Sequence, residues 1–148
     1  MDSVLVGVDK SRRSWRAVKF ALERAAMHDW DVTIVHVINW SPYKFSTKED
    51  NERRPIKRQQ EISRAESDVI KPLMEWISEE NLYPDTSRVT TLIRHGRPSD
   101  TMIKLAKSGG YDLVVVGRAG ESRMRSALFG STASRVAENS SVPVVVVP

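Results

Sequence analysis

The hydrophobic positions of this chain gather in five segments rich in β-branched residues, a pattern that predicts five β-strands. The segments run over Ser3–Asp9, Asp31–Trp40, Ser87–Gly96, Tyr111–Gly117 and Val142–Val147. Three of them are almost continuously apolar. Such runs are typical of strands covered on both faces, as in a parallel sheet between two layers of helices.

Between these strands, apolar residues recur at helical spacing, which predicts amphipathic helices. One pattern comprises Trp15, Val18, Leu22 and Ala25, and a second comprises Ile62, Ala65, Val69, Leu73 and Ile77. Shorter helices are expected at Pro98–Lys107 and Ser131–Asn139. Pro72 falls inside the second pattern. It is expected to kink or split that helix, because proline removes a backbone hydrogen bond.

Strands and helices alternate along the chain, which implies right-handed crossovers and an open, doubly wound α/β fold. We expect a single domain over residues 1–148. Its five-stranded parallel sheet should carry helices on both faces and have the strand order 3-2-1-4-5. A length of 148 residues with 40% apolar content is enough for one domain with a hydrophobic core.

The polar segment Ser41–Gln60 is bracketed by prolines, and we interpret it as a long loop that follows the second strand. Its charged composition is typical of a mobile, solvated loop. The alternative is a dedicated binding element whose cations meet an anion; these cations are Arg53, Arg54, Lys57 and Arg58.

Composition narrows the function classes only partly. The chain has no cysteine, which excludes disulfides, a thiolate nucleophile and a cysteine-based zinc site. It has no apolar run long enough to span a bilayer and no secretory signal pattern, so we expect a cytoplasmic protein without a membrane partner. The formal net charge of +4 favours anionic partners without choosing among nucleotides, nucleic acids and acidic membranes.

A glycine-rich stretch, VVVGRAGESRMRSALFGST, follows the fourth strand directly. In an open parallel sheet, ligands bind beyond the carboxyl ends of the strands, which is where this stretch begins. Its last residues open the final helix, whose free N–H groups and dipole favour an anion. The candidate phosphate-binding residues are Gly117, Gly120, Gly130, Ser131 and Thr132, with Arg118, Arg123 and Arg125 as further candidate phosphate contacts. Taken alone, the stretch is equally consistent with ordinary turn chemistry between a strand and a helix.

Two common nucleotide motifs are absent. A Walker loop requires the sequence GxxxxGK[ST], and the chain contains no Gly-Lys pair. The dinucleotide fingerprint GxGxxG would follow the first strand, where the chain has only VGVDKS. Neither a P-loop nor a dinucleotide-binding domain is therefore expected.

The spacing Gly117-x2-Gly120-x9-Gly130-Ser131 at the fourth strand resembles the universal stress protein family, in its nucleotide-binding branch. The resemblance covers nearly the whole chain. VLVGVDKS resembles the family's first strand and aspartate turn, IVHVI its second strand, and HGRPSDTMIKLAK its Gly-x-Pro turn into a helix. YDLVVVGRAG and SVPVVVVP resemble its fourth and fifth strands.

The resemblance implies a binding site for ATP or another adenine nucleotide, with Mg²⁺ or Mn²⁺ shared among the phosphates rather than held by side chains. Asp9 would lie against the nucleoside and Val37 against adenine, while Val116 and Gly117 complete the pocket wall. Gly120, Gly130, Ser131 and Thr132 would bind ribose and phosphates. The family often has valine at the position of Thr132, and nothing specific is implied for Ser41–Gln60.

Several of these residues also have plain structural interpretations. Asp9 is suited to capping the turn or helix that follows it. His36 points away from its neighbours Val35 and Val37, which favours a packed or hydrogen-bonded histidine over a catalytic base. Trp15 and Trp76 lie on apolar helix faces and are expected in the core.

Three functions remain. The first is an ATP-binding stress or regulatory module that acts through a conformational or oligomeric change; the sequence does not identify a regulatory protein partner for it. The second is a slow ATPase or phosphotransferase that uses a hydroxyl such as Ser122 or Ser126, although no residue stands out as an activating base and none is assigned as catalytic. The third, a basic nucleic-acid-binding protein, is disfavoured because no groove-reading or stacking motif occurs.

The last strand also predicts an oligomer. Val142–Val147 is strongly apolar and lies at a sheet edge in the expected strand order. Pro143 has no N–H, which suits a strand with one open side. We therefore expect a homodimer in which this strand pairs with its own copy, and the family resemblance points the same way.

Overall fold

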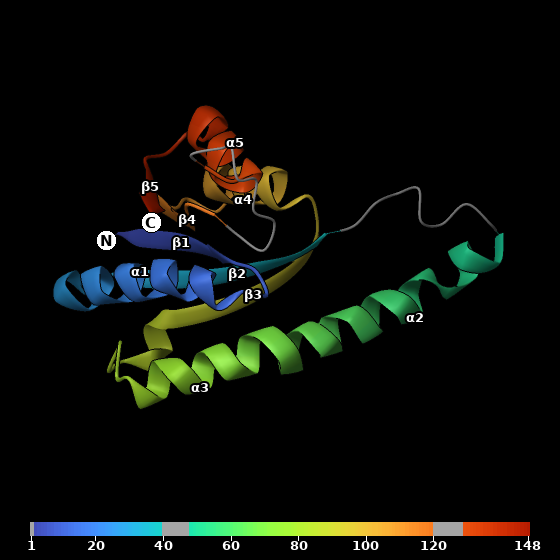
Figure 1. The fold of residues 1–148 in the computed structure, drawn as a ribbon, viewed down its shortest axis with the longest axis horizontal. Coiled ribbons are helices and arrows are strands. Elements are labelled where there is room, and N and C mark those ends of the chain that lie inside the picture. The colour runs from blue at the N-terminus through green and yellow to red at the C-terminus, as the bar shows by residue number, and fades with distance from the viewer. Residues whose placement is uncertain (1, 40–47, 120–128) are drawn as a thin grey trace.

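The computed structural model describes residues 2–39, 48–119 and 129–148, without the side chains of residues 48–51. Its centre is a parallel sheet with the order β3-β2-β1-β4-β5 (Figure 1). The strands are β1 (Ser3–Val8), β2 (Asp31–Asn39), β3 (Val89–Gly96), β4 (Leu113–Gly117) and β5 (Val144–Val147). The predicted strand order and doubly wound α/β class are confirmed. Strands β1 and β2 begin where expected, and β1 ends one residue early. Strands β3, β4 and β5 each begin two residues later than expected; a turn precedes β3, and Pro143 precedes β5.

Helices cover both faces of the sheet (Figure 1). One face carries α1 (Trp15–His28) and the rod formed by α2 (Lys48–Ala65), a π-helical stretch (Glu66–Ile70) and α3 (Lys71–Glu79). The other face carries α4 (Pro98–Ser108) and α5 (Ser131–Asn139). Short 3₁₀ turns at Arg12–Ser14 and Thr86–Arg88 complete the described elements.

The alternation of side chains along the strands divides the core in two. Val4 and Val6 of β1 pack with Leu22 of α1 and Leu73 of α3 on one face. Leu5 packs with Met102 of α4 on the other face. Burial of an aliphatic side chain of this kind stabilises the fold by about 1.5–3 kcal/mol, so both helical layers are needed to hold the sheet.

Trp15 of α1 and Trp76 of α3 are partly buried against the core between these helices and the sheet, as expected. Their ring centroids are 4.9 Å apart. The guanidinium of Arg12 lies over the Trp15 ring, 4.8 Å from its centroid. These aromatic rings therefore join α1 to α3, and they are not among the residues that line the large pocket at the strand ends.

The prediction of a loop over Ser41–Gln60 is wrong from Lys48 onward, where the chain is helical. The segment is rich in lysine, glutamate, arginine and glutamine, which have high helix propensity, and this propensity outweighs the presence of Pro55. Residues 41–47 lie outside the described part of the chain. Figure 1 shows α2 and α3 as one long rod whose α2 end projects beyond the sheet.

Pro72 splits the second helix as predicted, but it does not redirect the rod. The residues just before it, Glu66–Ile70, form a π-helical stretch, and Pro72 then occupies the first turn of α3. Because Pro72 has no N–H to donate to the carbonyl groups of that stretch, the regular hydrogen-bond ladder is interrupted there. The hydrogen-bond pattern changes while the helix axis continues.

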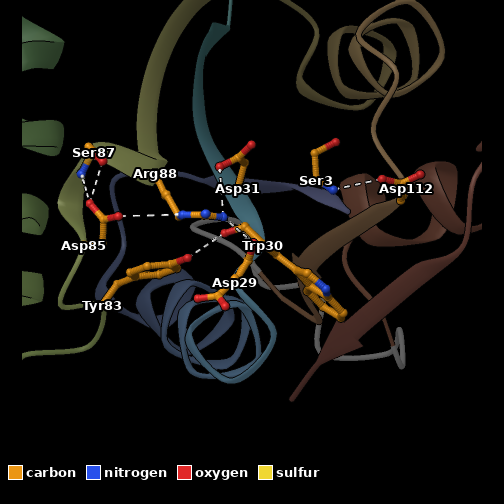
Figure 2. A network of polar contacts seen from close by, with 9 residues as sticks. All are labelled: Ser3, Asp29, Trp30, Asp31, Tyr83, Asp85, Ser87, Arg88 and Asp112. Atoms are coloured by element: carbon orange, nitrogen blue, oxygen red, sulfur yellow. Dashed lines mark hydrogen bonds and ion pairs between the residues drawn. The ribbon is translucent and has the colours of Figure 1, made fainter. Parts of the chain in front are cut away.

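A network of polar contacts lies at the amino ends of the strands (Figure 2). The Tyr83 hydroxyl donates a hydrogen bond to the Trp30 carbonyl oxygen at 2.8 Å. The Arg88 guanidinium donates to the Asp29 carbonyl oxygen and lies 3.8 Å from the Asp31 carboxylate. These contacts fix the start of β2 against the segment that leads into β3, and they leave the opposite end of the sheet open.

Within the described ranges, no helix combines the length and the apolar character needed to cross a membrane.

Candidate nucleotide-binding site

A pocket of about 1120 Å³ opens at the carboxyl ends of the strands. Residues that end β1, β2 and β4 form its floor, and the first turns of α4 and α5 form one wall. The opposite wall comes from the last turn of α2 and the π-helical stretch. Strand order reverses between β1 and β4, so the pocket lies where open α/β sheets bind their ligands.

Asp9, directly after β1, lines this pocket and also stabilises the turn that follows. Its Oδ1 atom accepts hydrogen bonds from the Ser11 backbone N–H at 2.8 Å and from the Ser11 hydroxyl at 2.6 Å. The Ser14 hydroxyl accepts a weaker bond from the Asp9 N–H and donates to the Ser11 carbonyl oxygen. The turn-forming role predicted for Asp9 is confirmed, and the carboxylate is held rigidly at the pocket wall.

The chain after β4 is bound to the start of α5. Arg118 N–H donates to the Val147 carbonyl oxygen, and Gly130 N–H donates to the Arg118 carbonyl oxygen, both at 2.7 Å. Gly130 is the extended N-cap of α5, and its carbonyl oxygen accepts the Ser134 N–H. The first-turn residues of α5, beginning with Ser131 and Thr132, therefore present N–H groups at the pocket wall, where the helix dipole is positive.

The described residues around Gly117 leave room for a side chain at this position. A Cβ atom there would lie 3.7 Å from the Ala119 carbonyl oxygen, an ordinary van der Waals distance. Gly117 is thus not required for packing with these residues, and a larger side chain would occupy space at the pocket wall.

The turn from β3 into α4 depends on glycine. Gly96 has a φ of +146°, a conformation that other residues rarely adopt. Arg97 follows as the N-cap, and Pro98 begins α4. This turn places Arg97, Pro98 and Ser99 along the pocket.

Cations exceed carboxylates around the pocket. Within the described ranges, the basic side chains that line it are Lys10, Arg64, Arg97, Arg118 and Arg135, and the acidic ones are Asp9, Glu61 and Asp68. The excess positive charge favours an anionic ligand. In the same ranges, no cluster of three or more histidine, aspartate or glutamate side chains is positioned to hold a metal ion.

The buried polar side chains gather at this pocket. Among the described residues they are Ser14, His36 and Ser99, and all three line it. His36 is 4% exposed, and its Nδ1 lies 3.0 Å from the Val8 carbonyl oxygen, so Nδ1 carries the proton and donates. The prediction of a packed, hydrogen-bonded histidine is confirmed.

The structure brings most of the candidate site residues together. Those that line the pocket are Asp9, Val37, Val116, Gly117, Arg118, Gly130, Ser131 and Thr132. Gly120, Arg123 and Arg125 lie outside the described residues, as do the hydroxyl candidates Ser122 and Ser126.

Other pocket residues were not predicted. Ser99 and Met102 come from α4, and Arg64 and Asp68 come from the rod on the opposite side. The Gly-x-Pro turn before α4 was a usable signal for Ser99, because a helix that starts at the carboxyl end of a strand faces the ligand side of the sheet. No local signal marks Arg64 or Asp68, since their approach depends on how the rod crosses the sheet.

Comparison with known proteins agrees with this geometry. The sequence matches the Universal stress protein family over residues 1–148. A universal stress protein from Mycolicibacterium smegmatis is 32% identical across 97% of this chain and 47% of its own length. One from Methanocaldococcus jannaschii is 28% identical across 97% of this chain and 80% of its own length. The chain thus spans about half the length of the mycobacterial relative.

Solved structures of the family share the fold. The universal stress protein UspA from Lactobacillus plantarum has a TM-score of 0.75 and 25% identity, with 99% of this chain and 97% of that chain covered. A universal stress protein in complex with cAMP has a TM-score of 0.61 and 26% identity, with 99% and 96% covered. One from Archaeoglobus fulgidus in complex with dAMP has a TM-score of 0.66 and 20% identity, with 100% and 98% covered.

The strand order, the pocket at the switch point and the match along the full sequence agree, and this chain belongs to the Universal stress protein family.

Proposed function

We propose that this protein binds an adenine nucleotide in the pocket at the carboxyl ends of the strands and acts as a regulatory module in the stress response. The observation that carries the proposal is the pocket itself. It combines an apolar floor, an excess of cations and the N-terminus of α5 at one place. The relatives in complex with cAMP and dAMP make adenine nucleotides the natural candidates.

The phosphates would bind at the start of α5. Backbone N–H groups of Ser131 and Thr132 are positioned there with the positive end of the helix dipole, and both residues also carry hydroxyl donors. Arg118 also lines the pocket, and its positive charge would neutralise part of the phosphate charge. Gly117 and Gly130 both line the pocket and would let the ligand approach the backbone closely, because glycine has no side chain.

The nucleoside would lie over the ends of β1, β2 and β4. Val37 and Val116 provide an apolar surface for adenine. The Asp9 carboxylate at the end of β1 would accept hydrogen bonds from the ribose hydroxyl groups. Because the Ser11 contacts fix its orientation, little side-chain entropy would be lost on binding.

A divalent ion, Mg²⁺ or Mn²⁺, would join the phosphates and reduce their mutual repulsion. The residues of the pocket would support such an ion mainly by positioning the phosphates that hold it. The pocket offers Ser131 and Thr132 hydroxyls near the proposed phosphate position, and no carboxylate cluster of the described chain is arranged for direct ligation. The ion would therefore be held mainly by phosphate oxygens.

We propose that binding, rather than catalysis, is the main activity. His36, the one histidine among the described pocket residues, donates through Nδ1 to the Val8 carbonyl oxygen and serves the fold. A site that binds ground state and transition state equally does not accelerate hydrolysis. The output would be a change of conformation or assembly, exerted in the cytoplasm on a regulatory partner.

The proposed assembly is a homodimer through β5. This strand is at the edge of the sheet, and its four valines are only partly buried in the single chain. Exposed edges invite pairing with another strand. Two copies related by a two-fold axis would pair β5 with β5 antiparallel.

Two measurements test the nucleotide proposal. Denaturing the purified protein and determining the mass of any released small molecule would identify a ligand that copurifies. Equilibrium dialysis of nucleotide-free protein with ATP and Mg²⁺ should then show saturable binding of one nucleotide per chain. Absence of saturation at millimolar ATP would overturn the proposal.

A further inference from the structure

The pocket is lined by residues from both faces of the sheet, and we call the part on each face a lobe. Val35 and Val37 of β2 belong to the core under α4 and α5, whereas Ile34 belongs to the core under α1 and α3. His36 alternates with its neighbours and lies on the Ile34 face. Since Val35, His36 and Val37 all line the pocket, the pocket extends over both faces.

The lobe on the α4 face combines an apolar floor with the polar start of α5, where Ser131 and Thr132 line the pocket. Its lining residues in the core under α4 and α5 are Val35, Val37, Met102, Val116 and Ala133. An apolar floor of this kind suits a flat aromatic base better than a ribose or a phosphate, which require polar partners. Charged side chains of the pocket instead belong to its rim, such as the exposed Arg97 and Arg118.

Ser99 is a buried polar residue beside this apolar floor. It is only 2% exposed, and it lines the pocket from the first turn of α4, directly after Pro98. In the described part of the chain, its hydroxyl has no hydrogen-bond partner. The hydroxyl is not among the fully buried polar atoms that lack a partner, so it remains accessible from the pocket, and an occupant of the lobe that bonds to it takes the place of water.

We infer that the Ser99 hydroxyl binds the polar edge of the nucleobase and favours a base with an exocyclic amino group. The inference rests on the proposed function. A hydroxyl both accepts and donates one hydrogen bond readily. Adenine presents an amino donor next to a ring-nitrogen acceptor, so one hydroxyl can bond to both. Ser99 is then a polar contact for the base beside the apolar floor of the lobe.

The test compares ATP with purine riboside triphosphate, which lacks the amino group, on the wild type and on Ser99→Ala, by calorimetric titration. The wild type should bind ATP about three- to tenfold more tightly than the analogue, the size of one neutral hydrogen bond. Ser99→Ala should bind ATP more weakly and should bind both nucleotides with affinities within about twofold of each other. Ser99→Cys, which is somewhat larger than serine and is a weak donor and acceptor, should behave as Ser99→Ala does.

Ser108→Ala is the matched control, because Ser108 lies at the other end of the same helix and its hydroxyl donates to the Lys104 carbonyl oxygen. It should retain the wild-type preference. A full preference for ATP in folded Ser99→Ala or Ser99→Cys would overturn the inference and leave the proposed function intact. Failure of the wild type to bind either nucleotide would instead overturn the proposed function, and the inference with it.

Discussion

Met102 of α4 lies directly over Gly7 of β1. A Cβ atom at residue 7 would be 2.5 Å from the Met102 sulfur atom, closer than real side chains approach. Both residues line the pocket, and Met102 is 2% exposed. The absence of a side chain at Gly7 therefore lets Met102 form part of the apolar floor of the lobe on the α4 face without filling that lobe.

Gly7→Ala should weaken nucleotide binding while the protein stays folded. The clash is with the far end of a flexible side chain, so Met102 would move toward the lobe at a cost of about 1 kcal/mol in unfolding free energy. The ATP affinity should fall about tenfold, as binding would have to displace that side chain. Calorimetry and urea unfolding measure the two effects. Shortening the clashing residue in Gly7→Ala/Met102→Val should restore part of the affinity, and wild-type affinity in Gly7→Ala would show that the lobe is not used.

ATP turnover should be slow. The pocket offers donors for bound phosphates, whereas we assign the Asp9 carboxylate to the ribose and His36 to its bond with the Val8 carbonyl oxygen, so neither serves to activate water. We expect phosphate release well below about one per second, the lower range of ordinary enzymes. A coupled phosphate assay with purified protein measures this rate. Sustained release at or above that value, abolished in Ser131→Ala, would favour the ATPase alternative.

The proposed β5 dimer predicts opposite effects at neighbouring residues. The carbonyl oxygens of Pro143 and Val147 accept hydrogen bonds from the backbone of β4 and of Arg118, which follows it. The backbone groups of successive strand residues point to opposite sides, so the N–H of Val146 points toward the open edge of the sheet. Val146→Pro should remove an intermolecular hydrogen bond and yield a folded monomer. Val145→Pro, the control, should instead destabilise the pairing of β5 with β4. Light scattering and thermal unfolding distinguish them, and a monomeric wild type at micromolar concentration would refute the dimer.

Tyr83 should make the unfolding free energy of the protein fall as the pH rises into the alkaline range. Burial is the main cause that raises the pKa of Tyr83 above its ordinary value. The neutral phenol is therefore favoured in the folded state, so its contribution is present below the unfolded pKa of about 10 and is lost as pH rises through the folded pKa. Tyr83→Phe should lose about 1 kcal/mol at neutral pH, through the bond to Trp30, and the difference from the wild type should shrink above pH 10. Urea unfolding at several pH values measures this, and a constant difference would contradict it.

The fold was predictable because its signals are local. The runs in β1, β2 and β4 are apolar on both faces, and strand-helix alternation then leaves few topologies. The position of α2 was not predictable in the same way. Its sequence is polar and contains Pro55, so composition indicated a loop, while the high helix propensity of its charged residues decided the outcome.

The site was predictable where it follows the strand ends and not where it depends on packing. Asp9, Gly117 and Ser131 adjoin strand or helix ends that the pattern locates. Ser99 and Met102 belong to the pocket because α4 packs closely on β1 at Gly7, a contact between residues far apart in sequence. No local pattern encodes that approach.

The central claim is that nucleotide phosphates bind beside Gly130 at the start of α5. Gly130 has φ −66° and ψ 165°, an extended conformation that valine adopts readily, so Gly130→Val should fold with a loss of about 1 kcal/mol or less. Its side chain would block the approach of phosphate to the first-turn N–H groups. The most direct measurement is calorimetric titration of ATP with Mg²⁺ into the wild type and Gly130→Val. The account predicts saturable binding by the wild type and at least a hundredfold weaker binding, about 2.7 kcal/mol, by the folded variant. Equal affinities in the two proteins would contradict it.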